Sequence, residues 1–168
     1  MKFSKSGKVD LWIIGYGNRH RRDDGAGRYV ARQLMPRYAA VESVHIRSLH
    51  QLGPELAEDL QAATRIIFID AILGAQSGYG RWQRVQPVAD MEGISHGLTA
   101  DILIGLTELI YNRCPPAWMV SIPGEDFSFG EGLSRTSSDY AMRATREIAH
   151  VIDCCLKDKK CVTYVPAR

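Results

Sequence analysis

The sequence predicts an α/β fold: a three-layer α/β/α sandwich in which a twisted, mostly parallel sheet of about five strands is flanked by helices. Two observations lead to this prediction. Short apolar runs, of the length of buried strands, alternate with stretches in which apolar residues recur at helical spacing. The 168 residues, of which 45% are hydrophobic and 24% charged, are enough for one domain with a hydrophobic core. We therefore expect a single domain over residues 1–168.

The expected strands follow from the apolar runs. The first run, residues 11–14, is followed by Gly15 and Gly17, which permit a tight turn. The third run ends in the only charged residue of IIFID, Asp70, which we take as the final residue of that strand. The other candidates are residues 44–49 and 118–122, with residues 81–88 as an edge or antiparallel strand.

Helical spacing marks the segments between these strands. Tyr29, Val30, Gln33 and Leu34 fit one face of a helix that begins soon after the first turn. We expect a short helix at 53–60, a strongly amphipathic one at 98–111 and a long final one at 136–156.

Composition excludes several classes of function. The formal net charge of +2 is too small to indicate a nucleic-acid or membrane partner, although residues 19–22 form a basic cluster. Neither a secretory signal nor an apolar run of transmembrane length is present, so we expect a cytoplasmic protein. The four cysteines form no CxxC pair and indicate reduced, packed thiols.

Polar residues that follow the expected strands form a candidate metal site. In open α/β sheets, functional residues gather beyond the carboxyl ends of the strands. The first strand leads to Asp23 and Asp24, the strand IIFID to Asp70, and His96 precedes the amphipathic helix. Two carboxylates and a neutral imidazole suit a divalent first-row metal with open positions. The alternative is that the aspartates cap turns or helices and that His96 is an ordinary hydrogen-bonded histidine.

Four blocks of sequence resemble one protein family. They are GYGNRHRRDDGAG, the strand end IDA, SHGLTADIL and IPGEDFSFGEGLS. Together, in this order and over nearly the whole chain, they resemble the hydrogenase maturation endopeptidases. The stretch SLHQLGPELAEDL, with the last block, is most similar to the branch that processes the large subunit of bidirectional, NAD-reducing nickel-iron hydrogenases.

The resemblance implies a peptidase that removes a C-terminal extension from the hydrogenase large-subunit precursor after nickel insertion. The family's nickel contacts fall on Asp24, Asp70 and His96. The nickel is then a recognition mark carried by the substrate and need not be a resident cofactor. It would polarise the scissile carbonyl or activate a water, with Asp23 as a candidate proton acceptor. We expect substrate contacts from Gly17, Asn18, Arg21 and Gly97.

Some interpretations stay open at this point. The family usually has an aliphatic residue where this chain has His20, within a basic turn that is either solvated or faces the precursor. A nickel-dependent chaperone that binds the same precursor without cutting it would need the same ligands. A peptidyl-tRNA-hydrolase-like enzyme shares the opening strand and GxGN turn, but its later blocks are missing. A dinucleotide site is disfavoured because His20 replaces the third glycine of GxGxxG.

Overall fold

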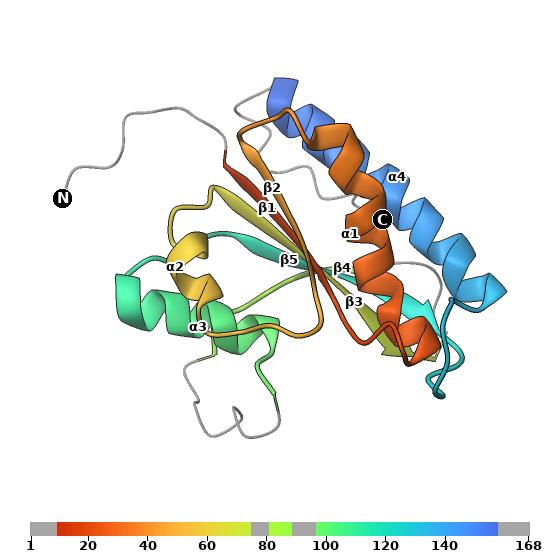
Figure 1. Cartoon of the computed structure of the whole chain (residues 1–168). Coiled ribbons are helices and arrows are strands. Elements are labelled where there is room, and N and C mark those ends of the chain that lie inside the picture. The colour runs from red at the N-terminus through yellow and green to blue at the C-terminus, as the bar shows by residue number, and fades with distance from the viewer. Residues whose placement is uncertain (1–9, 75–80, 89–96, 158–168) are drawn as a thin grey trace.

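The computed structural model describes residues 10–74, 81–88 and 97–157 (Figure 1). Its centre is a five-stranded sheet in the order β2-β1-β3-β5-β4. Four strands are parallel: β1 (Leu11–Tyr16), β2 (Val44–Leu49), β3 (Arg65–Leu73) and β5 (Ala117–Gly124). The edge strand β4 (Arg81–Arg84) pairs with β5 in the antiparallel direction. The predicted mostly parallel sheet is confirmed.

Helices cover both faces of this sheet. Figure 1 shows α1 (Ala26–Tyr38) and α4 (Arg135–Lys157) on one face and α2 (Leu56–Leu60) and α3 (Ala100–Tyr111) on the other. A short 3-10 helix, η1 (Arg22–Gly25), joins the turn after β1 to α1. The three-layer α/β/α arrangement is therefore confirmed.

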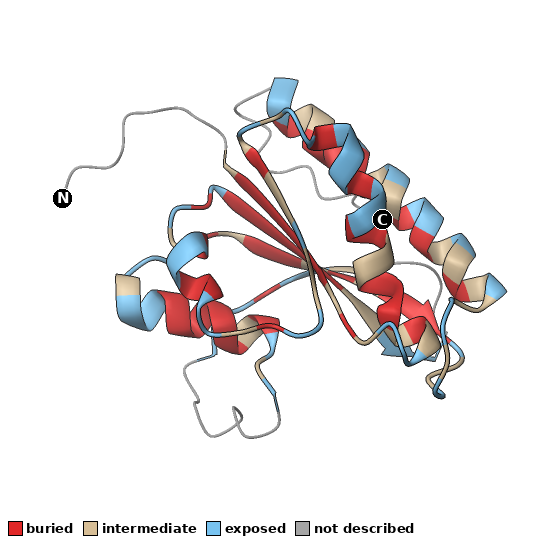
Figure 2. Cartoon of the chain, in the orientation of Figure 1, coloured by how far each residue is buried: buried red, intermediate tan, exposed pale blue. Residues whose placement is uncertain are grey.

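Successive side chains of the central strands point to opposite faces of the sheet, and a hydrophobic core forms on each face. Leu11 and Ile13 pack toward α1 and α4, whereas Trp12 and Ile14 belong to the cluster under α2 and α3. Ile13 and Ile14 are fully buried, and burial of each such side chain contributes about 1.5–3 kcal/mol. Figure 2 shows the buried residues on the strands and on the helix faces turned toward them.

Several strand boundaries differ from the prediction. β1 ends at Tyr16 instead of residue 14, β4 ends at Arg84 instead of residue 88, and β5 spans Ala117–Gly124 instead of 118–122. β3 does not end at Asp70 but continues to Leu73, because Ala71, Ile72 and Leu73 pair with the last residues of β5. Its pairing with β1 ends earlier, at Gly15 opposite Ile69. Asp70 is therefore the first residue of β3 beyond its pairing with β1, opposite the last residue of β1, Tyr16, and it still lies at the carboxyl edge of the sheet centre.

The helices are close to their predicted extents. α2 is shorter than 53–60, and α3 begins at Ala100 rather than at residue 98. Among the described residues, no helix combines the length and the apolar character needed to span a membrane.

Candidate active site

The turn after β1 brings the chain back against η1. Gly17 has a φ of +128°, and a Cβ atom built on it would lie 1.9 Å from the carbonyl oxygen of Asp24. A side chain at this position would therefore both strain the backbone and collide with η1. This close approach explains why the first block of the sequence needs glycine between the strand and the aspartates.

The same turn orients the carboxylate of Asp24. The backbone N–H of Asn18 donates a hydrogen bond to Asp24 Oδ2 (2.8 Å), and the N–H of Asp24 donates to the carbonyl of Arg21 (3.1 Å). Asp24 is half-buried, and its Oδ1 has no hydrogen-bond partner in the part of the chain that the structure describes. One oxygen is thus held in place, while the other forms no hydrogen bond with the described residues.

Asp70 approaches the same place from the sheet. Its Oδ1 accepts a hydrogen bond from the N–H of Ala71 (2.8 Å), and the phenol of Tyr16 also donates to its carboxylate. Burial is the main reason that the pKa of Asp70 is raised to about 6, and the negative charge of Asp24 adds to this effect. The two hydrogen bonds lower the pKa and only partly offset burial. Ionised Asp70 is thus a carboxylate that a cation would stabilise.

Tyr16 stays a phenol in this environment. Burial, followed by the charge of Asp70 and the hydrogen bond to it, raises the pKa of Tyr16 far above its ordinary value. Tyr16 is the last residue of β1, so the strand itself delivers a fixed hydrogen-bond donor to Asp70.

Asp24 and Asp70 line one cavity of about 260 Å³, which we call the carboxylate cavity. The structure therefore brings together two of the three predicted nickel contacts, from η1 and from β3. The third, His96, lies outside the described residues. Its neighbour in the chain, Gly97, lines the cavity, as do Gly17 and Tyr16. Of the described residues alone, no group of three acidic, histidine or cysteine side chains is placed to hold a metal ion.

Asp23 has a different environment from its neighbour. It is fully buried and accepts hydrogen bonds from the N–H groups of Glu125 (2.8 Å) and Asp126 (3.0 Å) and from both the N–H (2.6 Å) and the hydroxyl (2.8 Å) of Ser134. Burial raises the pKa of Asp23, but these donors outweigh it and hold the pKa below its usual value. The contacts favour a structural role, and the role of proton acceptor stays a prediction.

The other two predicted substrate contacts lie on the rim of the turn. Asn18 contributes its N–H to Asp24, and its side-chain oxygen accepts the N–H of His20 (3.0 Å). Arg21 is exposed; its Nε donates to the carbonyl of Phe127 (3.2 Å) and its guanidinium lies 5.9 Å from the ring centre of Phe129. Neither residue is among the described residues that line the carboxylate cavity.

The sequence interpretation did not single out Tyr16, His50, Gln51, Leu52 and Leu98 of the cavity lining, and of these Tyr16 and His50 carry titratable side chains. His50 directly follows β2, and its carbonyl accepts the N–H of Gly17 (3.2 Å). The rule that functional residues follow parallel strands would have found it, had the rule been applied to β2 as well as to β1 and β3.

The carboxylate cavity brings together side chains of the types that can bind a cation. Two carboxylates, one with a raised pKa, share a cavity with an imidazole-bearing residue and a phenol donor. Carboxylate oxygens and imidazole nitrogens suit a divalent first-row metal ion. Asp24 and Asp70 are the described residues of this cavity that could supply carboxylate oxygens to such an ion.

Comparison with known proteins gives structural likenesses only. Neither a scan against protein-family models nor a sequence search of curated proteins finds a match. The fold is similar to that of a [NiFe] hydrogenase maturation protease, HycI, from Thermococcus kodakarensis KOD1, with a TM-score of 0.66 and 22% identity over 88% of this chain and 95% of that one. It is also similar to the hydrogenase maturating endopeptidase HybD from E. coli, with a TM-score of 0.63 and 18% identity over 87% of this chain and 94% of the other. The chain therefore has the fold of the hydrogenase maturation proteases.

Proposed function

We propose that the protein is an endopeptidase that removes the C-terminal extension of a nickel-iron hydrogenase large-subunit precursor. The observation that carries the proposal is the convergence of Asp24 and Asp70 on one cavity. These are two of the residues that the resemblance assigns to nickel recognition. The likeness in fold to solved maturation proteases supports the same reading.

The proposed mechanism uses nickel as part of the substrate. Asp24 and Asp70, with His96 as the third predicted contact, would bind the nickel that the precursor already carries. A nickel ion in this position supplies Lewis-acid chemistry, either at the scissile carbonyl or at a bound water. Asp24 offers its Oδ1, which has no hydrogen-bond partner among the described residues, and Tyr16 donates a hydrogen bond to Asp70. Because Asp23 already accepts four hydrogen bonds, it is poorly suited to take the proton.

The test is to incubate the protein with a nickel-loaded large-subunit precursor and to detect cleavage as a decrease in the mass of the precursor. We expect the unmodified protein to shorten the precursor and the Asp24→Asn, Asp70→Asn and His96→Ala variants to lose roughly a hundredfold or more in kcat/KM, because each substitution removes a contact to nickel. Asp59→Asn, at an exposed aspartate on α2, is the matched control and should retain full activity.

Two results would contradict the proposal in different ways. Binding of the precursor without shortening would favour the non-cleaving nickel-dependent chaperone. Full activity in all three site variants would overturn the assignment of the site while leaving the peptidase in place.

The substrate branch is part of the same proposal. The stretch SLHQLGPELAEDL includes His50, which lines the carboxylate cavity, and this stretch resembles the branch that serves bidirectional, NAD-reducing hydrogenases. We therefore propose the large subunit of such a hydrogenase as the substrate. A precursor of that type should be cut faster than one from a hydrogenase of another type, and equal rates would contradict this choice.

A further inference from the structure

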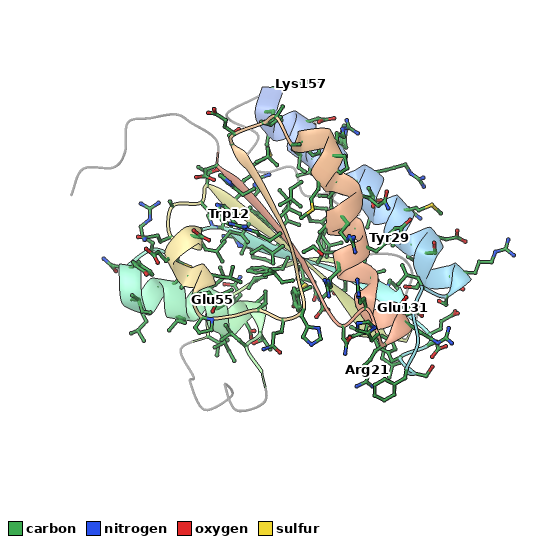
Figure 3. The ribbon with its side chains drawn as sticks, in the orientation of Figure 1. Trp12, Arg21, Tyr29, Glu55, Glu131 and Lys157 are labelled. Atoms are coloured by element: carbon green, nitrogen blue, oxygen red, sulfur yellow. The ribbon has the colours of Figure 1, made fainter. Side chains whose placement is uncertain are left out.

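A second cavity, of about 460 Å³, lies on the other side of η1 and is lined by four arginines: Arg19, Arg22, Arg28 and Arg32. We call it the arginine cavity. It is formed by the turn before η1, the first turns of α1 and the start of α4, and Tyr29 and Ser138 also line it. Figure 3 labels Tyr29 on α1 and Glu131 in the loop before α4, which lie on the same side of the sheet. Within the described part of the chain, no acidic side chain lines this cavity.

Most of the positive charge in this cavity is uncompensated. Arg22 pairs with Asp126, with 3.3 Å between Nε and Oδ2. The Nε of Arg28 donates to the hydroxyl of Ser48 (3.4 Å). Because the hydroxyl is neutral, this hydrogen bond does not neutralise the charge of Arg28. Among the residues that the structure describes, Arg19, Arg28 and Arg32 form no ion pair. In a chain whose formal net charge is only +2, this is a concentrated cationic surface.

The backbone at Arg22 is strained, and local contacts hold its side chain in place. Arg22 has a φ of +45°, in the left-handed region that favours glycine, and a side chain there costs on the order of 1–2 kcal/mol. Its guanidinium packs against Gly130, where a Cβ atom would lie 2.9 Å from Arg22 Nε. Arginine therefore occupies a position at which glycine would be the less strained residue.

Both cavities border η1. Asp24 lines the carboxylate cavity, whereas Arg22 and Gly25, from the same four-residue helix, line the arginine cavity. The Cα atoms of consecutive residues such as Asp24 and Gly25 are about 3.8 Å apart, so the two cavities are close neighbours. A polypeptide bound in the carboxylate cavity therefore needs only a few more residues to reach the arginine cavity.

We propose that the arginine cavity binds aspartate or glutamate side chains of the precursor, a few residues from the bond that is cut. This inference rests on the proposed function, because it takes the polypeptide substrate from there. Guanidinium groups bind carboxylates through paired, charge-assisted N–H bonds, and several of them select acidic residues over neutral ones.

The direct test measures binding of a fluorescein-labelled tetraglutamate peptide to the full chain by fluorescence anisotropy. We expect binding that weakens as salt is added and that is about tenfold weaker in the Arg28→Gln/Arg32→Gln double variant. Arg113→Gln, at an exposed arginine after α3, is the matched control and should bind as the unmodified protein does. Circular dichroism of the double variant checks that it is folded.

Two outcomes of this test would overturn the proposal. A tetraglutamine peptide that binds as tightly as tetraglutamate would show that the carboxylates are not recognised. Tighter binding of inorganic phosphate than of tetraglutamate, lost in the double variant, would assign the cavity to a small free anion instead.

Cleavage assays separate this inference from the proposed function. With the nickel-loaded precursor, the double variant should show a raised KM and a much smaller change in kcat. An unchanged KM, with cleavage intact, would overturn the inference and leave the peptidase standing. Absence of cleavage by the unmodified protein would overturn the proposed function, while the peptide-binding measurement would still decide the role of the arginines.

Discussion

Asp23 and Asp24 are adjacent in the chain but have opposite environments. Asp23 is fully buried, accepts four hydrogen bonds and has a lowered pKa. Asp24 accepts one hydrogen bond, keeps one oxygen free of partners among the described residues, and shares a cavity with Asp70, whose pKa is raised. Asp23 therefore stabilises the site because its hydrogen-bonding capacity is filled. Asp24 and Asp70, which accept fewer hydrogen bonds from the described residues, remain available to a ligand in the cavity.

The largest expected effect tests the structural role of Asp23. Asp23→Ala leaves the N–H groups of Glu125, Asp126 and Ser134 without their acceptor, so we expect a loss of about 3–5 kcal/mol in the free energy of unfolding. Asp24→Ala, which removes one partly buried acceptor, should lose about 1 kcal/mol. Urea denaturation measures both, and Asp23→Asn, which keeps one acceptor oxygen, should lie between them. Equal losses for the two alanine variants would contradict the comparison.

The next-largest expected effect tests how far the ionised form of Asp70 lowers the free energy of unfolding. Because the folded-state pKa is raised from 3.8 to about 6, this group favours folding most below pH 3.8 and loses that contribution as the pH rises through 6. Asp70→Asn keeps the acceptor for Ala71 and Tyr16 but removes the charge. We expect it to raise the free energy of unfolding by about 2 kcal/mol at pH 7 and by little at pH 4. Thermal unfolding at the two pH values measures this, and a destabilised variant at pH 7 would contradict it.

The smallest effect is on the pH dependence of cleavage. Below pH 6 Asp70 is mostly protonated and cannot contact a cation, so kcat/KM for the nickel-loaded precursor should fall about tenfold per pH unit there and level off above pH 7. Circular dichroism over the same range controls for unfolding. A profile that stays flat down to pH 5 would show that ionised Asp70 is not required.

Sequence reasoning located the strands because four of them are short apolar runs bounded by turns. It misplaced the end of β3 because the charge of Asp70 resembles a strand end, whereas the continuation to Leu73 depends on pairing with β5. That pairing joins segments about fifty residues apart and leaves no local signal.

Part of the candidate site could also be predicted from the sequence. Asp24 and Asp70 follow strands and could be brought together by the rule for parallel sheets. The difference between Asp23 and Asp24 could not be predicted, because the donors to Asp23 lie more than one hundred residues further along the chain. Arg28 and Arg32 are four residues apart on one helix and share a face, so their proximity could be predicted. Arg22 lines the same cavity, but its left-handed backbone conformation has no signal in the sequence.

The hydrogen bonds of Asp23 also set limits on how this protein can diverge. The loop that carries Glu125, Asp126 and Ser134 is fastened to η1 at both of its ends, and between them lie Phe129, which is 85% exposed, and Gly130. The tip of the loop is held against the turn after β1 as well, because the N–H of Gly130 donates to the carbonyl of His20 (2.9 Å) and the N–H of Arg22 donates to the carbonyl of Gly130 (3.2 Å). Insertions at the anchor positions would displace Asp23 and, with it, the neighbouring Asp24. The loop before α4 and the turn after β1 therefore form one unit, in which a change of length in either segment would move the other.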